Sequence, residues 1–280
     1  MKKITLGFSP CPNDTYIFDA LVNSRIDTGD YIFEPVLKDV EELNRMAREG
    51  LLDVTKISVG AYAAVSMNYI ILDAGSALGK GVGPLIVSGH PSADLNHPKT
   101  TIAIPGKYTT ANLLLSVFYP QLTLKKEALF SDIESMVSDG SVDLGLLIHE
   151  GRFTYASKGL FRQADLGEVW EKAMDMPLPL GCIGASRKMH QEDAQNISHL
   201  IHESILFARN HPSEGKDYIK AHAQEMDDTV IDNHISLYVN DFSLTLGREG
   251  QKAIEFLLVK GAEAGLLPET TKPIFIDPIP

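Results

Sequence analysis

The sequence has only two cysteines, one tryptophan and no long apolar run, and it contains fewer basic than acidic residues. No segment approaches the roughly 20 consecutive apolar residues that a membrane-spanning helix requires, so we expect no membrane partner. Lys and Arg number 25 against 37 Asp and Glu, which gives a formal net charge of −12. Without a basic stripe the chain cannot neutralise many phosphates, so we expect no nucleic-acid partner. To bind an anionic small molecule, the protein would need a few hydrogen-bond donors or cationic side chains at the binding site.

The two cysteines, Cys11 and Cys182, are far apart in the sequence. The first segment, MKKITLGFSPCP, begins with lysines as a signal peptide does, but a glycine and two prolines interrupt its apolar stretch. We therefore expect a cytoplasmic protein, in which the reducing environment favours free thiols over a disulfide. Cys11 could serve as a nucleophile, but the sequence shows no activating partner for it.

Strand and helix patterns alternate along the first two thirds of the chain. KITLGFS (3–9) has the composition of a buried strand, and DTYIFDALVNSRI (14–26) follows as a helix. After LPLGCIGASR (178–187) the pattern is helical for most of the remaining length. With 44% hydrophobic and 22% charged residues, the composition is that of a globular protein. The order of the elements predicts an α/β fold with a helical carboxyl-terminal tail.

A similar pattern of segments occurs twice. ITLGFSPCPNDTYIF and TIAIPGKYTTANLLL each run from a strand through a proline-containing loop into a helix. EGLLDVTKIS and DGSVDLGLLIHE each close a helix and enter a strand, with Asp53 and Asp143 in equivalent places. Ordinary helix-to-strand loops could produce this likeness, but the shared order favours two lobes of similar build. Such a protein would bind its ligand at the carboxyl ends of strands, in a central cleft.

Two strand-like segments flank the second lobe, and we expect the chain to cross between the lobes along them. They are GPLIVSG (83–89) and LPLGCIGASR (178–187). The sequence thus predicts a larger lobe of residues 1–89 plus 185–280, a smaller lobe of residues 90–184, and a hinge of two crossover strands. This is the plan of the two-lobed, type II periplasmic-binding-protein-like fold, whose lobes close on a small molecule.

His149 ends the strand-like segment VDLGLLIH. An imidazole at the carboxyl end of a strand, inside a closing cleft, has the position of a general base that works near neutral pH. The alternative is a structural histidine that bonds a neighbouring carbonyl group. Glu150 could orient the ring, but consecutive strand residues point to opposite faces, so we assign Glu150 no role.

Two further pairs of polar residues are candidates for ligand binding. Thr109 and Thr110 stand at the start of the helix TANLLLSVF. The N–H groups and dipole of a helix N-terminus bind anions and the hydroxyls add donors, although either threonine could be only a helix cap. Lys56 and Ser58 end the segment VTKIS. Lys56 is either an exposed surface charge or the local cation that a carboxylate ligand needs.

Other candidate sites lack the context that their chemistry requires. His199 and His202 share a helical segment with Glu203, but no further ligand accompanies them, so a surface helix face is favoured over a metal site. The glycines of GKGVG lack the strand–helix context of a dinucleotide-binding loop. The remaining helical histidines, among them His234, have polar surroundings and no visible partner.

Six segments together resemble one enzyme family: GFSPCPNDTYIF, DVTKIS, ALGKGVGP, PGKYTTANLLL, IHEGRFTY and LPLGCI. From near residue 4 to the helical carboxyl terminus, the chain is similar to the 1,4-dihydroxy-6-naphthoate synthases, which act late in the futalosine route to menaquinone. The resemblance implies a cytoplasmic lyase that converts cyclic dehypoxanthinyl futalosine to 1,4-dihydroxy-6-naphthoate and releases the sugar-derived fragment. It implies no cofactor and no metal, and His149 as the proton acceptor. The implied substrate-binding residues are Lys56, Ile57, Ser58, Thr109 and Thr110, with Ile57 acting through backbone groups.

Two other functions stay open at this point. A chorismate dehydratase-like sister enzyme of the same pathway would share the lobes but bind a smaller dicarboxylate. A non-catalytic small-anion binding protein would release its ligand unchanged, although the absence of an export signal weighs against such a receptor. In each case the partner is a small-molecule carboxylate. The sequence leaves both a monomer and a homodimer open.

Overall fold

The computed structural model describes residues 1–223 and 227–277 of the chain. These residues form two lobes, each built on its own β-sheet with flanking helices, and the α/β class predicted from the sequence is confirmed. None of the helices in the described ranges is long and apolar enough to cross a membrane.

The larger sheet is mixed, with parallel strands on one side and a long antiparallel strand near the other. Its six strands are β1 (Lys2–Phe8), β2 (Tyr31–Leu37), β3 (Val54–Ser58), β4 (Tyr69–Ile71), β5 (Ala77–Gly79) and β11 (Leu178–Ser186). Their order is β2-β1-β3-β11-β4, and β5 also pairs with β11. The strand β1 is parallel to β2 and β3, whereas β11 runs antiparallel to its neighbours.

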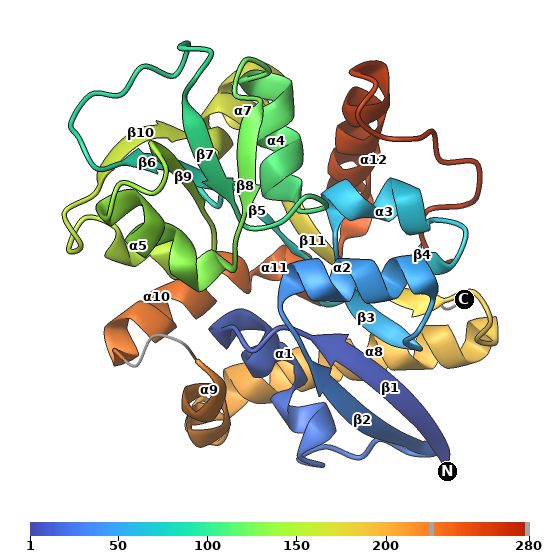
Figure 1. The fold of residues 1–280 in the computed structure, drawn as a ribbon. Helices are drawn as coiled ribbons and strands as arrows, with labels where there is room; N and C mark the ends of the chain where they lie inside the picture. Colours follow the sequence, from blue (N-terminus) through green and yellow to red (C-terminus); the bar gives the residue numbers. More distant parts are fainter. Residues whose placement is uncertain (224–226, 278–280) are drawn as a thin grey trace.

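The smaller sheet has a parallel half and an antiparallel half. Its five strands are β6 (Leu85–Ser88), β7 (Thr101–Ile104), β8 (Leu124–Glu127), β9 (Leu144–Leu147) and β10 (Phe161–Asp165). Their order is β10-β6-β9-β7-β8, with β7 parallel to both of its neighbours. In Figure 1 this sheet lies in the upper half of the molecule, and β1, β2 and β3 lie in the lower half.

Helices flank both sheets. The larger lobe contains α1 (Pro12–Val22), α2 (Val40–Glu49), α3 (Val59–Val65), α8 (Gln191–Asn210), α9 (Lys216–His222), α10 (Asp228–Tyr238), α11 (Asp241–Leu244) and α12 (Gly247–Glu263). The smaller lobe contains α4 (Thr110–Phe118), the short 3₁₀ helix η1 (Phe130–Asp132), α5 (Ile133–Ser138), α6 (Gly151–Thr154) and α7 (Leu166–Met174). Because α1 packs against α8, α9 and α10, the helical tail returns to the first helix of the chain.

The two lobes share one hydrogen-bond arrangement at the positions where the sequence pattern repeats. Oδ2 of Asp53 accepts bonds from N (2.9 Å) and Oγ1 (2.7 Å) of Thr5. Oδ2 of Asp143 accepts bonds from N (2.7 Å) and Oγ1 (2.7 Å) of Thr101. Each aspartate precedes a strand that lies parallel to the threonine's strand, β3 beside β1 in one lobe and β9 beside β7 in the other. The repeat in the sequence is therefore a repeat of structure.

The crossings between the lobes lie earlier in the chain than the sequence predicted. The strand β6 pairs with β9 and β10, so it belongs to the smaller lobe, while β11 pairs with β3 and belongs to the larger one. The predicted divisions at 89/90 and 184/185 thus fall at the far ends of these strands, and sheet membership changes before Leu85 and before Leu178. The sequence could not show this, because an apolar run does not reveal which sheet it joins.

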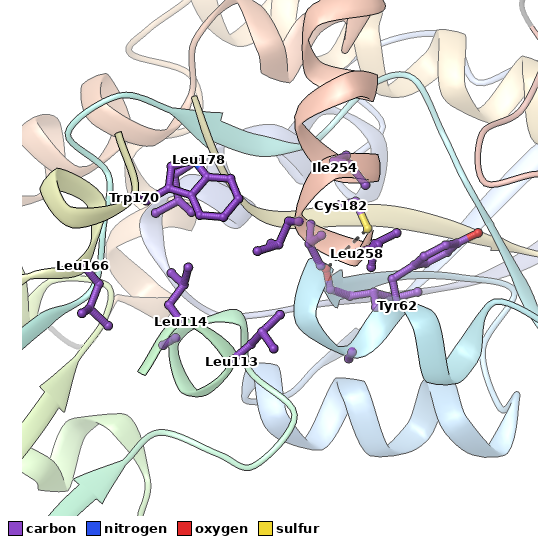
Figure 2. Packing of buried hydrophobic residues seen from close by; sticks show 14 of the residues in the cluster. Tyr62, Leu113, Leu114, Leu166, Trp170, Leu178, Cys182, Ile254 and Leu258 are labelled. Carbon is purple, nitrogen blue, oxygen red and sulfur yellow. Dashed lines mark hydrogen bonds between the residues drawn. The ribbon is translucent and has the colours of Figure 1, made fainter. Parts of the chain in front are cut away.

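One apolar cluster extends through both lobes (Figure 2). Leu114 of α4 and Trp170 of α7 come from the smaller lobe, while Tyr62 of α3 and Leu258 of α12 come from the larger lobe. All four side chains are almost completely buried. Burial of apolar surface stabilises a fold by about 25 cal/mol per Å². The shared cluster therefore holds the two lobes together beside the strand ends.

Candidate active site

A cavity lies between the lobes, where the strands β1, β3 and β9 end. The space between its walls is about 660 Å³, counting the solvent at its mouth. This size is within the range of pockets that hold small molecules. Both lobes contribute to its lining, which includes Ser9, Asp14, Lys56, Ser58, Thr109, Thr110, His149, His234 and Tyr238. The structure thus brings together five of the six site residues named from the sequence, all except Ile57.

Lys56 forms an ion pair inside the protein. Its Nζ lies 2.7 Å from Oδ1 of Asp14, and the two side chains are 7% and 1% exposed. The other carboxylate oxygen of Asp14 accepts bonds from N (3.1 Å) and Oγ (2.8 Å) of Ser9. Lys56 is therefore neither an exposed surface charge nor a free cation. A carboxylate ligand at this place would share the ammonium group with Asp14.

Ser58 and Ile57 are neighbours on β3 with different environments. The hydroxyl of Ser58 accepts a bond from Nδ2 of Asn44 (3.0 Å), and its N–H donates to Oδ1 of the same residue (2.9 Å). Ile57 is completely buried in the apolar cluster, and its backbone is paired with Cys182 in the sheet. Because strand residues alternate between faces, Lys56 and Ser58 face the cavity and Ile57 faces the core.

The two threonines at the start of α4 have different hydrogen-bond partners. Thr109 is the N-cap, because its hydroxyl accepts a bond from the N–H of Asn112 (3.2 Å). The hydroxyl of Thr110 accepts a bond from the N–H of Gly60 (2.9 Å) and donates to the carbonyl of Leu180 (2.6 Å). Thr110 therefore ties the smaller lobe to the larger one. Gly60 allows this approach, since a Cβ atom there would lie 3.0 Å from Cα of Thr110.

His149 lies just beyond the end of β9, in a backbone conformation that is unusual for a histidine. Its φ of 53° is left-handed, which ends the strand geometry after Leu147. The ring is partly buried and lines the cavity. Its centroid lies 4.9 Å from that of Phe130, edge to face, and 6.1 Å from that of His234. One side of the half-buried ring thus packs against protein, and the other side faces the cavity.

His234 of α10 reaches the same cavity from the larger lobe. The side chain is completely buried. Burial is the main factor that holds the pKa of His234 well below its ordinary value, and the nearby His149 and Lys56 add to it. Each of these factors disfavours a positive charge on the ring. At neutral pH this imidazole is therefore neutral, with one nitrogen that donates and one that accepts.

Comparisons with known proteins show which family the chain resembles along its length. A family model described as menaquinone biosynthesis matches residues 4–263. The chain belongs to this family. A relative from Thermus thermophilus, named 1,4-dihydroxy-6-naphthoate synthase, is 45% identical over 276 residues, which cover 99% of this chain and 100% of the relative. A relative of the same name from Streptomyces coelicolor is 38% identical over 273 residues, covering 95% of both chains. The family expected from the six motifs is confirmed, and with it an enzyme of menaquinone biosynthesis.

Solved structures show the fold of this menaquinone-biosynthesis family member. Protein AF1704 from Archaeoglobus fulgidus has a TM-score of 0.90 at 35% identity, over 95% of this chain and 98% of that one. The alkanesulfonate-binding protein SsuA from Xanthomonas axonopodis pv. citri has a TM-score of 0.71 at 12% identity, over 98% and 96% of the two chains. At such low identity the second likeness concerns the fold alone. The periplasmic-binding-protein-like fold predicted from the sequence is confirmed.

Several residues that line the cavity of this family member are not predicted from the sequence. They are Ser9, Asp14 and Tyr238, together with His234, for which the sequence pattern indicates only polar surroundings. A signal for His234 was present, since Ile231, His234 and Tyr238 follow the three- and four-residue spacing of a buried helix face. No comparable signal marked Asp14, because its partner Lys56 lies 42 positions away.

Within the described ranges, two groups of side chains have the spacing to hold a metal ion. One is His199, His202 and Glu203, on the surface of α8. The other is His149, Glu150 and His234 at the cavity. Two imidazoles and a carboxylate suit several divalent transition metals. The second group therefore needs an explanation, whether it binds a metal or acts without one.

Proposed function

We propose that this protein is a 1,4-dihydroxy-6-naphthoate synthase, a carbon–carbon lyase acting on cyclic dehypoxanthinyl futalosine, with His149 as the general base. Support comes from the relatives of that name, which match along nearly the full length of both chains. The structural observation that carries the proposal is the position of His149. Its half-buried imidazole lies just after β9, in a cavity shared with a helix N-terminus.

The N-terminus of α4 is the proposed binding site of the substrate carboxylate. The N–H groups of Thr110 and Ala111 have no acceptor within the helix, because they belong to its first turn. Both residues line the cavity, and the helix dipole adds a partial positive charge there. The Lys56–Asp14 pair adds an ammonium group whose charge is already compensated. The proposed carboxylate-binding site therefore consists mainly of neutral hydrogen-bond donors. This composition fits a protein in which acidic residues outnumber basic ones.

The proposed chemistry is a base-assisted elimination. His149 accepts a proton from the sugar-derived part of the substrate, and the electron pair left behind breaks a carbon–carbon bond in a retro-aldol-type step. The sugar-derived fragment leaves as a carbonyl compound, and the ring system keeps the electron pair of the broken bond, takes up a proton and becomes an aromatic naphthalenediol, which provides much of the driving force. Enclosure between two lobes would fix the orientation of the reacting groups and exclude water. The scheme uses no cofactor.

We also propose that the enzyme acts in the cytoplasm on a small-molecule carboxylate. Cys11 and Cys182 are both buried and free, which suits a reducing compartment. Burial raises the pKa of both thiols, to about 12 for Cys182, so neither is an activated nucleophile. Catalysis is accordingly assigned to an imidazole and not to a thiolate.

Replacement of the base tests the proposal. In His149→Ala we expect kcat to fall by about 10²–10⁴-fold, the usual contribution of a general base, while the dissociation constant of the product changes little. Turnover is followed by the ultraviolet absorbance of the naphthalenediol, and product affinity by calorimetric titration. The matched control is His199→Ala on the exposed surface of α8, which should keep wild-type turnover.

Two results would contradict the proposal. Near-wild-type turnover by His149→Ala would remove this residue from the role of base. Consumption of chorismate but not of cyclic dehypoxanthinyl futalosine by the wild-type protein would indicate the sister dehydratase, and recovery of both compounds unchanged would indicate a binding protein.

A further inference from the structure

A second imidazole and a carboxylate meet His149 at the cavity. Glu150 follows His149 in the chain, and His234 comes from α10. One ligand atom from each of the three side chains lies within 4.8 Å of the other two. His149 and Glu150 belong to the smaller lobe and His234 to the larger one, so the group forms only where the two lobes meet.

The backbone at His149 explains how two consecutive residues reach the same group. Strand alternation would point Glu150 away from His149, as expected from the sequence. The strand β9 already ends at Leu147, however, and the positive φ of His149 turns the chain before α6 begins at Gly151. Alternation therefore does not apply, and both side chains turn toward His234.

The polar atoms of this group are buried without hydrogen bonds. Both carboxylate oxygens of Glu150 and both ring nitrogens of His234 have no hydrogen-bond partner among the described residues. The two residues are 5% and 0% exposed. A buried carboxylate is unfavourable unless a donor or a positive charge compensates it. The two histidines, whose ring nitrogens lie within 4.8 Å of the carboxylate, have the right chemistry to compensate it.

The other charged side chains near His149, Glu150 and His234 already form ion pairs. Lys56 on β3 acts on His234 and pairs with Asp14 on α1, and Arg152, two positions after Glu150 on α6, lies 2.7 Å from Asp165. Cys11 and Tyr238 also face the group, and burial raises the pKa of each, so both are neutral near pH 7. Compensation for Glu150 must therefore come from His149, as a positive charge, or from His234, as a neutral N–H donor.

We propose that Glu150 and His234 are positioning residues that hold His149 ready for the proton transfer of the proposed function, on which this inference rests. When the proton leaves the substrate and binds a ring nitrogen of His149, the new positive charge lies beside the carboxylate of Glu150. The combined charge of the two side chains changes from −1 to 0, and no other bond in the group breaks. His234 stays neutral before and after, and it would orient Glu150 by donating its N–H once the two side chains, whose polar atoms lie within 4.8 Å, come within hydrogen-bond distance. The base is complete only when α10 of the larger lobe meets the smaller lobe.

The first variant removes the charge of the carboxylate while retaining its shape. In Glu150→Gln we expect a smaller fall in kcat than the loss of about 10²–10⁴-fold expected for removal of the base itself. The acidic limb of the kcat/KM profile should move to lower pH, because a nearby negative charge no longer favours the protonated base. KM should change little, since Glu150 does not line the cavity. The matched control is Glu255→Gln on the exposed face of α12.

The second pair of variants separates hydrogen bonding from packing at position 234. His234→Gln keeps a donor and should retain most of kcat, whereas His234→Leu keeps the bulk and should lose about as much kcat as Glu150→Gln. Replacing buried polar groups that lack partners by apolar ones is often neutral or stabilising, so Tm of the leucine variant should not fall. A purely structural role predicts the opposite, a lower Tm and an unchanged pH profile. His199→Gln on α8 is the control.

The outcomes distinguish this inference from the proposed function. If His149→Ala is inactive while Glu150→Gln and His234→Leu keep wild-type kcat and pH profile, the positioning role is wrong and the base assignment stands. If His149→Ala is itself active, the proposed function fails. The metal content of the purified wild-type enzyme decides the remaining alternative. We expect no stoichiometric metal and no effect of a chelator, and one bound ion per chain whose removal abolishes turnover would overturn the inference.

Discussion

Nζ of Lys56 lies 2.7 Å from Oδ1 of Asp14, and both side chains are almost completely buried beside the cavity. The pair joins β3 to the first turn of α1. Ser9 donates two further bonds to the same carboxylate, so both of its oxygens have partners. The lysine that the sequence offered as a cation for the ligand therefore also holds together one side of the site.

Breaking this pair should destabilise the protein strongly. In Lys56→Met the charge of Asp14 stays buried without its counter-ion, which typically costs about 3–5 kcal/mol of unfolding free energy. The double variant Lys56→Met/Asp14→Leu removes both charges and should recover most of this loss. Urea denaturation of the three proteins measures the effect.

The exposed pair of Lys3 and Glu34 provides the control. Its atoms lie 2.6 Å apart, but the side chains are 71% and 46% exposed. Lys3→Met should therefore cost only about 0–1 kcal/mol. Equal losses in Lys3→Met and Lys56→Met would show that the buried pair has no special role in stability.

Glu41 should make the stability of the protein depend on pH. Its Oε2 accepts a bond from the N–H of Tyr108 (3.0 Å), next to Thr109, and so connects α2 to the loop before α4. Burial is the largest factor that raises the pKa of Glu41, from 4.5 to about 6. Because the folded pKa exceeds the unfolded one, folding is favoured by the protonated form, and this contribution is lost as pH rises through 6.

Glu41→Gln should accordingly be more stable than the wild type above pH 7 and similar to it below pH 4.5. The amide oxygen of glutamine still accepts the bond from Tyr108. Thermal denaturation at several pH values gives the comparison, with the exposed Glu42 of the same helix replaced by Gln as the control. A difference between wild type and Glu41→Gln that is the same at every pH would contradict the account.

The sequence predicted the parts of the fold that depend on local pattern. The equivalence of Asp53 and Asp143 was visible because each aspartate stands at the same place between a helix and a strand, and the structure gives both the same bonds to a threonine. The crossings between lobes were misplaced because Leu85 and Leu178 begin strands that are apolar in either sheet. Strand pairing is a property of the whole chain.

The candidate site was predictable where it lies at strand ends and not where it depends on distant partners. His149 was found because it follows an apolar strand. Its neighbour Glu150 was excluded by strand alternation, which the left-handed backbone at His149 removes. His234 lies 85 positions further on, and packing of α10 against α1 and β5 brings it to the cavity.

A crystal structure of the enzyme with 1,4-dihydroxy-6-naphthoate bound tests the central claim most directly. We predict that the product's carboxylate lies on the N–H groups of Thr110 and Ala111. We also predict that a ring nitrogen of His149 lies within about 3 Å, or one water molecule, of the ring atom from which the sugar-derived fragment departed. Product bound between the lobes with His149 turned away from it, or product bound outside this cavity, would contradict the assignment of the base.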